Sequence, residues 1–410
     1  MVRQRALLAV VLLVLLMTAA CGGDSDDAPD DDPSSSRPPA AAPAPKRFDP
    51  PARFASEGQT LAKAPRRGGA LGKPEVAAVF VGSTLVYVDE SSLAGIDVVT
   101  GDDRWVTPMP GVTIAESTQI ATPILYEDRI YVAAAMTVPD GPRVSSHRAI
   151  SLAAVDPSTG AEVWTATIEA LPGDPVQDVR LVGVTADSIV LDTSTTTYVV
   201  DPQTRRTRWQ TQFFEPTVVD GTVVAGQLGE DATETKTRTV GLRLTDGVQL
   251  WSSAAAAQQG RSFPLGPGLM AVHGRDFASA EPFFDFLDPA TGESRYPGDS
   301  DELSALQSCW FDGRTLVVCA ATGTRTVAVG YNWSDLAEIW ELPVGDRAAP
   351  RVTGAWHGAV YGLLKGKPVT LDGRSGAVRT NAAGAAPALV NEYAGVSAES
   401  GSLRLFPALA

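Results

Sequence analysis

One eleven-residue phrase returns along most of this chain and constrains its fold more than any other feature. At residues 95–105 it reads Gly-Ile-Asp-Val-Val-Thr-Gly-Asp-Asp-Arg-Trp, and related copies stand at 154–164 and 199–209. Weaker copies follow. The aromatic residues that end five of the copies are Trp105, Trp164, Trp209, Trp251 and Trp340. A phrase that returns at a nearly fixed period indicates a fold built from repeated units.

The spacing of the copies matches the length of a propeller blade. The third residue of each copy, usually Asp, serves as a marker, and after the first interval these markers lie 40–45 residues apart. The series is Asp97, Asp156, Asp201, Arg243, Asp288, Asn332 and Asp372. Segments rich in β-branched residues precede each marker, and turn residues such as Asp-Gly introduce them. Each unit is therefore predicted to be a hairpin of strands A and B, a strand C that carries the marker, and a strand D that carries the aromatic residue.

We expect an all-β, eight-bladed propeller of four-stranded antiparallel blades, because eight segments of the B type precede copies of the pattern. A seven-bladed ring is the alternative if the final segment only caps the ring. The last unit reaches residue 410 after its third strand. An open ring would expose an unpaired sheet edge. We therefore expect a strand near residues 48–62 to complete the last blade and close the ring.

The motif Asp-x-x-Thr-Gly-x-x-x-Trp resembles the tryptophan docking motif of the PQQ-like β-propeller repeat, and the resemblance covers residues 76–407. It implies that the five tryptophans are wedges that dock one blade onto the next. The physical reading agrees: the turn needs Gly for a positive φ, the Asp can accept bonds from backbone amides of the turn, and the large ring packs between blades. Carbohydrate stacking is the weaker alternative, since regular spacing favours one structural role.

The first residues have the features of an export signal. Arg3 and Arg5 precede an apolar run at 6–16, which is too short to span a bilayer, and Thr18-Ala19-Ala20-Cys21 resembles the lipobox of bacterial lipoproteins. We expect residues 1–20 to be removed and Cys21 to carry lipid. An ordinary signal peptide cut after Ala20 is the alternative.

A linker is expected to follow. Residues 21–46 are rich in Asp, Ser, Pro and Ala and poor in large apolar groups, so they are predicted to be a disordered tether. The propeller then occupies 47–410. A lipid on Cys21 would place the propeller at the cell membrane, anchored on the extracytoplasmic side.

The two remaining cysteines are predicted to form a disulfide. If Gly313-Arg314-Thr315 is the loop of a hairpin, Cys309 stands directly opposite Cys319. The export signal supplies the oxidising compartment that such a bond requires.

No catalytic, cofactor-binding or metal-binding residue is predicted. The family includes quinoprotein dehydrogenases, which hold PQQ and Ca²⁺, but this sequence lacks their adjacent cysteine pair and any Cys-x-x-Cys-His haem motif. The net charge is −15 and no basic stripe is visible, which excludes nucleic acid as an expected partner.

Two insertions interrupt the regular spacing, at 136–147 and at 228–239, and both fall between strands B and C of their units. They extend one face of the propeller, where binding sites are often built, although neutral loop growth would look the same. The preferred hypothesis is a non-enzymatic scaffold that binds a protein or a cell-wall component on this face. A similar layout occurs in envelope assembly lipoproteins of the BamB type. The alternatives are a PQQ-dependent oxidoreductase and a ligand sensor that acts through a membrane partner.

Overall fold

The computed structural model describes one compact unit within Pro45–Ala410. The described residues are 45–63, 76–112, 120–139, 146–230, 235–254, 256–295, 306, 308–321, 326–399 and 402–409. They form antiparallel strands and no helix, mostly in four-stranded sheets, so the predicted all-β class is confirmed. The expected signal peptide, Cys21 and most of the linker lie outside the described residues.

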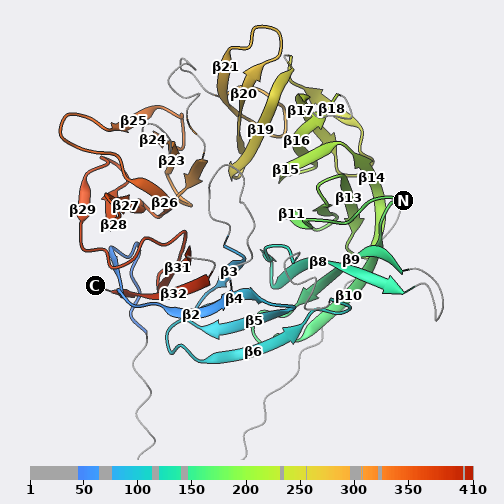
Figure 1. The fold of residues 1–410 in the computed structure, drawn as a ribbon, viewed down its shortest axis with the longest axis horizontal. Coiled ribbons are helices and arrows are strands. Elements are labelled where there is room, and N and C mark those ends of the chain that lie inside the picture. Colours follow the sequence, from blue (N-terminus) through green and yellow to red (C-terminus); the bar gives the residue numbers. More distant parts are fainter. Residues whose placement is uncertain are drawn as a thin grey trace, which may run out of the picture. The chain divides into compact units, whose positions relative to one another are not determined.

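Each sheet of four strands is a meander of consecutive strands (Figure 1). The first contains β3 (Ala78–Val81), β4 (Thr84–Asp89), β5 (Ser92–Asp97) and β6 (Asp103–Pro108). The next two contain β7 (Ile124–Tyr126), β8 (Arg129–Pro139), β9 (Ser146–Val155) and β10 (Glu162–Glu169), then β11 (Arg180–Val184), β12 (Ile189–Asp192), β13 (Thr196–Asp201) and β14 (Arg206–Gln212). Two later ones contain β22 (Ser308–Phe311), β23 (Leu316–Ala321), β24 (Val327–Asn332) and β25 (Glu338–Leu342), then β26 (Arg351–Trp356), β27 (Ala359–Leu364), β28 (Lys367–Asp372) and β29 (Val378–Thr380).

A larger sheet lies between these groups. It joins β15 (Phe214–Asp220), β16 (Val223–Gly229), β17 (Lys236–Arg243) and β18 (Gln249–Ser252) to β19 (Ala257–Gly266), β20 (Leu269–Asp276) and β21 (Pro282–Leu287). The joint is short: Lys236 and Thr237 of β17 pair with Gln258 and Ala257 of β19. Strand β18 pairs only with the second half of β17, so the first half of β17 keeps an unpaired edge. Strand β19 pairs with that edge.

The first and last strands of this unit share a sheet. β1 (Arg53–Phe54) and β2 (Gln59–Lys63) both pair with β32 (Ser402–Leu409), which continues through β31 (Ala394–Glu399) to β30 (Leu389–Val390). The N-terminal segment thus occupies the outer side of the last meander.

The hydrophobic core lies between neighbouring sheets. The first strand of each meander contacts the first strand of the next, from β3 to β7 and onward to β30, and β2 contacts β4. One buried cluster contains Val86 of β4 together with Ile130 and Val132 of β8. Another contains Leu85 of β4 together with Val396 of β31, so the last meander packs against the first.

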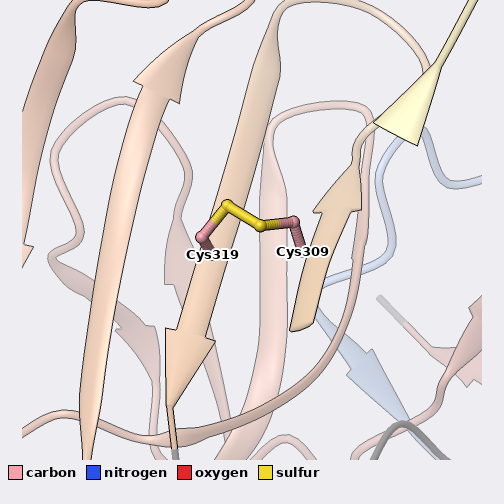
Figure 2. Close-up of a disulfide and its surroundings, with 2 residues drawn as sticks. All are labelled: Cys309 and Cys319. Atoms are coloured by element: carbon pink, nitrogen blue, oxygen red, sulfur yellow. A yellow bond between two sulfur atoms is a disulfide. The ribbon is translucent and has the colours of Figure 1, made fainter. Parts of the chain in front are cut away.

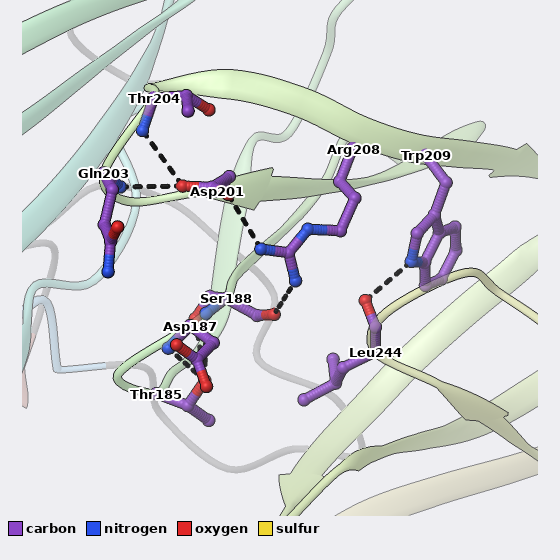
Figure 3. A network of polar contacts seen from close by, with 9 residues as sticks. All are labelled: Thr185, Asp187, Ser188, Asp201, Gln203, Thr204, Arg208, Trp209 and Leu244. Atoms are coloured by element: carbon purple, nitrogen blue, oxygen red, sulfur yellow. Dashed lines mark hydrogen bonds and ion pairs between the residues drawn. The ribbon is translucent and has the colours of Figure 1, made fainter.

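The marker residue closes the turn between the third and fourth strands, here called the marker turn. The Oδ1 atom of Asp201 accepts bonds from the amides of Gln203 and Thr204 at 2.8 and 2.9 Å (Figure 3). Its Oδ2 atom accepts a bond of 2.8 Å from Arg208 on the fourth strand. At Asp201 the marker side chain therefore fixes both the turn and the start of the next strand, as its Asx-turn chemistry favours.

The repeated tryptophans bridge to the neighbouring sheet. The indole N–H of Trp209 donates to the carbonyl oxygen of Leu244 at 2.8 Å (Figure 3). Leu244 directly follows the marker of the next unit. The indoles of Trp105, Trp251 and Trp340 make the same bond to Pro157, Pro289 and Gly373. Trp164 is buried and lies under the guanidinium of Arg205, 5.3 Å from the ring centroid, in the next marker turn.

Close packing around these rings depends on glycine. A Cβ atom on Gly95, in the strand beside Trp105, would lie 2.4 Å from the indole, and one on Gly160, in the next marker turn, would lie 2.5 Å from it. The ring is therefore held between a backbone of its own sheet and a backbone of the next.

Cys309 and Cys319 form a disulfide across the hairpin β22–β23 (Figure 2). They are direct partners in the strand register, and their Cα atoms lie 4.0 Å apart. Both are buried with Phe286 and Tyr331, so the bond belongs to the core.

The described ends of both insertions belong to paired strands, so the hairpins extend further than the sequence interpretation expected, and residues 140–145 and 231–234 lie outside the described residues. Strand β8 pairs with β9 as far as Pro139 and Ser146, and β16 pairs with β17 as far as Gly229 and Thr237.

Candidate binding face

Successive turns of a meander alternate between its two ends. The marker turns lie at one end, here called the turn face. The hairpins between second and third strands and the connections between sheets lie at the other, here called the loop face. Both extended hairpins, β8–β9 and β16–β17, are on the loop face.

A cavity of about 520 Å³ opens on the loop face where the meanders that begin with β11, β15 and β19 meet. This volume lies within the range of small-molecule sites, about 300–1,000 Å³. We call it the loop-face cavity. The lining residues on which the argument depends are Arg180, Asp192, Phe213, Glu215, Gln227 and Arg261.

A buried ion pair forms one wall of the cavity. The Nε and Nη2 atoms of Arg180 donate to Oδ2 of Asp192 at 2.9 and 2.5 Å. Asp192 is almost completely buried, whereas the Arg180 side chain is partly exposed. Burial raises the pKa of Asp192, and the Arg180 guanidinium opposes that rise. Glu215 lies 3.7 Å from Arg180 on the open side.

The wall beside this ion pair has an unusual backbone. Asp178, Ser194 and Phe213 all line the cavity and have φ values of 51°, 67° and 61°. The left-handed region is costly for residues other than glycine, and such residues gather at functional sites. The amide of Phe213 donates to Thr195, and its carbonyl oxygen accepts from Gly229, so two strands hold this conformation.

A hydrogen-bond network behind the wall keeps it in place. Asp174 accepts bonds from the hydroxyls of Thr193, Thr195 and Tyr198 and from the amide of Val176. Burial would raise the pKa of Asp174, but these bonds, first that from Tyr198, lower it overall. The connection that carries Asp178 is thereby tied to the turn that carries Ser194.

The inner end of the cavity is polar. Gln227 is 4% exposed, and its Nε2 atom donates to the hydroxyl of Thr239 at 3.0 Å. Within the described part of the chain its Oε1 atom has no hydrogen-bond partner. Gly260 lies against this group: a Cβ atom there would be 2.7 Å from the Thr237 hydroxyl and 3.0 Å from Gln227 Oε1.

The residues singled out from the sequence do not line this cavity. The docking tryptophans bond to the turn face, and the disulfide lies in the core between β21 and β24. Cys21 lies outside the described residues. The lining residues come from three repeat units, and none belongs to the repeated phrase. Only the insertion at 228–239 pointed toward this region.

A second hollow, of about 550 Å³, lies on the turn face between β24 and β28. Of the charged residues that line it, Asp372 and Arg379 bond to each other at 2.7 Å across a marker turn. This hollow is therefore explained by the repeat itself.

Within the residues that the structure describes, no group of three or more metal-binding side chains comes together. The same residues contain no helix long and apolar enough to cross a membrane.

A family model described as "Outer membrane protein assembly factor BamB" matches residues 54–187 and 148–295, which together make up more than half of the chain. Among curated proteins, none matches the sequence significantly.

Solved structures share the fold at low identity. The crystal structure of the computationally designed Ika8 protein has a TM-score of 0.53 at 13% identity, and the match covers 85% of this chain and 100% of Ika8. BamB from Moraxella catarrhalis has a TM-score of 0.48 at 14% identity, with 86% of this chain and 96% of that chain covered.

Proposed function

We propose, because this chain belongs to the family described as outer membrane protein assembly factor BamB, that it is a non-enzymatic propeller scaffold of the bacterial cell envelope. It binds a protein or an envelope component through its loop face. The observation that carries the proposal is the asymmetry of the two faces: the turn face is occupied by repeated docking bonds, while the loop face bears the extended hairpins and the cavity.

The propeller of this proposal has eight blades. Six meanders have four strands of their own, counting β15–β18 as one. The strands β19–β21 form another, with a bridge between Leu287 and Ser294 in the place of the fourth strand. The strands β30–β32 form the eighth, which β1 and β2 complete and which closes the ring.

The proposal includes a lipid anchor on Cys21 and an extracytoplasmic location. The sequence Thr18-Ala19-Ala20-Cys21 after an apolar run supports the anchor, since a lipobox cysteine receives diacylglycerol before cleavage. The disulfide between Cys309 and Cys319 supports an exported protein, because such bonds persist in oxidising compartments. Residues 21–46 then provide a tether between the membrane and the propeller.

The extended hairpins supply the binding surface. A hairpin that extends from a rigid sheet presents backbone and side chains to a partner without disturbing the core. The hairpin β8–β9 carries His147, which contacts Glu169 of β10 at 2.9 Å and so holds the hairpin beside its own sheet. The hairpin β16–β17 carries Glu230, which pairs with Lys236 at 2.5 Å.

Site-specific photo-crosslinking in cells tests the loop face. A photoreactive amino acid at Pro139 or Glu230 should capture partners that the same amino acid at Ala290, in a marker turn, does not. Replacing 138–147 by Asn-Gly, so that Thr137 and Arg148 become the last pair of the hairpin, should abolish capture at Glu230 if one partner spans both hairpins. Equal capture from both faces would contradict the proposal.

A cofactor assay tests the non-enzymatic part. The full-length protein incubated with PQQ and Ca²⁺ should show no dye-linked alcohol or sugar oxidation and should retain no quinone absorbance after desalting. Turnover above that of the heat-denatured protein would contradict this part of the proposal alone.

A further inference from the structure

The loop-face cavity contains a polar group that the protein itself leaves unsatisfied. Gln227 Oε1 is buried and has no hydrogen-bond partner among the described residues. A buried acceptor without a partner destabilises a fold, so such a group calls for an explanation. The cavity beside it supplies one, since a ligand that carries a hydrogen-bond donor would satisfy it.

The charges around the opening select against ionic ligands. Asp178, Asp192 and Glu215 are carboxylates, and Arg180 and Arg261 are cations. Asp192 is already paired with Arg180, and Glu215 lies 3.7 Å from the same guanidinium, so most of these charges compensate one another. A neutral ligand can bond to groups of each sign without disturbing these pairs.

The available hydrogen bonds are those that hydroxyl groups can complete. A hydroxyl donates one bond and accepts two. It can donate to Gln227 Oε1 or to Glu215 and accept from the guanidinium of Arg261, all of which line the cavity. A ligand with several hydroxyl groups on a small frame would use these positions together.

An apolar surface stands at the edge of the same cavity. Phe213 is 44% exposed although it is a large aromatic residue, and its φ of 61° holds it at this edge. The exposed face of an aromatic ring packs against flat arrays of C–H groups. The backbone bonds to Thr195 and Gly229 fix the backbone that carries this ring.

We propose that the loop-face cavity binds a neutral sugar residue, free or at the end of an envelope glycan. Its hydroxyl groups bond to Gln227 and Glu215 and accept from Arg261, and its C–H face packs on Phe213. This inference rests on the proposed function, because it names a ligand for the same loop face.

The test measures binding of defined saccharides to the full-length protein in a detergent without a sugar headgroup. Saturation-transfer NMR and calorimetric titration would use glucose, mannose, galactose, arabinose, N-acetylglucosamine and trehalose, with glucuronate and glucosamine as charged controls. We expect at least one neutral sugar to bind and to bind more tightly than both charged sugars.

Two variants separate recognition from folding. Gln227→Met keeps the shape but lacks the acceptor, so it should weaken binding by about tenfold. The same variant also removes the 3.0 Å bond from Gln227 Nε2 to the Thr239 hydroxyl, so its melting temperature without ligand is measured to show that it remains folded. Phe213→Asn tolerates the left-handed backbone and should weaken binding by a similar factor. Ile339→Ala on the turn face is the control and should bind normally.

The outcomes are distinct. No saccharide binding, tighter binding of a charged sugar, or unchanged binding by Gln227→Met would overturn the sugar site. Crosslinking at Pro139 and Glu230 does not depend on that result. If no sugar binds but crosslinking succeeds, the scaffold function stands and only the sugar site is refuted. If a sugar binds but crosslinking fails, only the partner-binding role of the loop face is refuted.

Discussion

The marker turns contain a position whose conformation is fixed even where its residue changes. The fifth residue of every described marker turn has a positive φ: Gly101, Gly160, Arg205, Gly247, Gly292, Leu336 and Gly376. At Arg205 the value is 59°. In the left-handed region of positive φ, a residue with a Cβ atom is destabilised by about 1–2 kcal/mol, whereas glycine is not.

Comparing Arg205→Gly with Arg205→Ala isolates this cost. Both variants lose the contact between the guanidinium and the Trp164 ring, 5.3 Å from its centroid, which contributes about 0.5–1 kcal/mol at an exposed site. Only the glycine variant relieves the backbone, although it also loses about 0.5–1 kcal/mol through the freedom of the unfolded chain. The glycine variant should therefore be more stable than the alanine variant by about 1 kcal/mol.

Urea denaturation followed by tryptophan fluorescence measures this difference. The neighbouring Arg206 is an exposed strand residue of β14 and provides the control. There the order should reverse, with Arg206→Gly less stable than Arg206→Ala by about 0.5–1 kcal/mol. If Arg205→Ala were as stable as Arg205→Gly, the turn would not impose the left-handed conformation, and the reasoning about the repeat would fail.

Four further results are expected. Trp340→Ala should lower the free energy of unfolding by about 3–5 kcal/mol, because the ring is buried and its N–H bonds to the next sheet. A urea midpoint equal to that of the wild type would count against a docking role. Replacing Cys309 and Cys319 by Ser should cost about 2–3 kcal/mol, since the closed loop is short, and thiol labelling of the unreduced, denatured wild type should modify neither. Bonds from Thr204 and Arg208 lower the pKa of Asp201 to about 2, so its contribution to stability is present above about pH 4 and lost as the pH falls toward 2; Asp201→Asn should flatten part of that acid profile. Cys21→Ala should release the protein from membranes, and unchanged fractionation would argue against lipidation.

The repeat made the sheets predictable because local chemistry determines each unit. The predicted strand at 85–88 lies within β4, and the predicted C strand before Asp201 is β13. A short turn, a marker side chain and an aromatic residue four positions later are contained within about a dozen residues, so a single sequence displays them. The register of Cys309 opposite Cys319 was predictable for the same reason, since a short loop fixes it.

The cavity was not predictable because its residues share no pattern. Arg180, Phe213, Gln227 and Arg261 are contributed by four different strands or connections, and they meet only after three meanders pack together. The polar run in the insertion at 228–239 favours a surface loop when the sequence is considered alone. Thr237 and Thr239 in fact face the interior and are buried, where they contact Gln227 and the neighbouring backbone.

The two faces divide stability from specificity. On the turn face, the structure describes seven marker turns, and four docking tryptophans donate an indole bond to the next meander, so a change in one turn affects a junction. On the loop face, the connections vary in length, from the two residues Lys365 and Gly366 between β27 and β28 to the long hairpins. Among the described residues, no docking tryptophan bonds to these connections. Changes of length or charge there leave the junctions intact. The strained Phe213 and the unsatisfied Gln227 are therefore tolerable on the loop face, because docking bonds on the other face hold the meanders together.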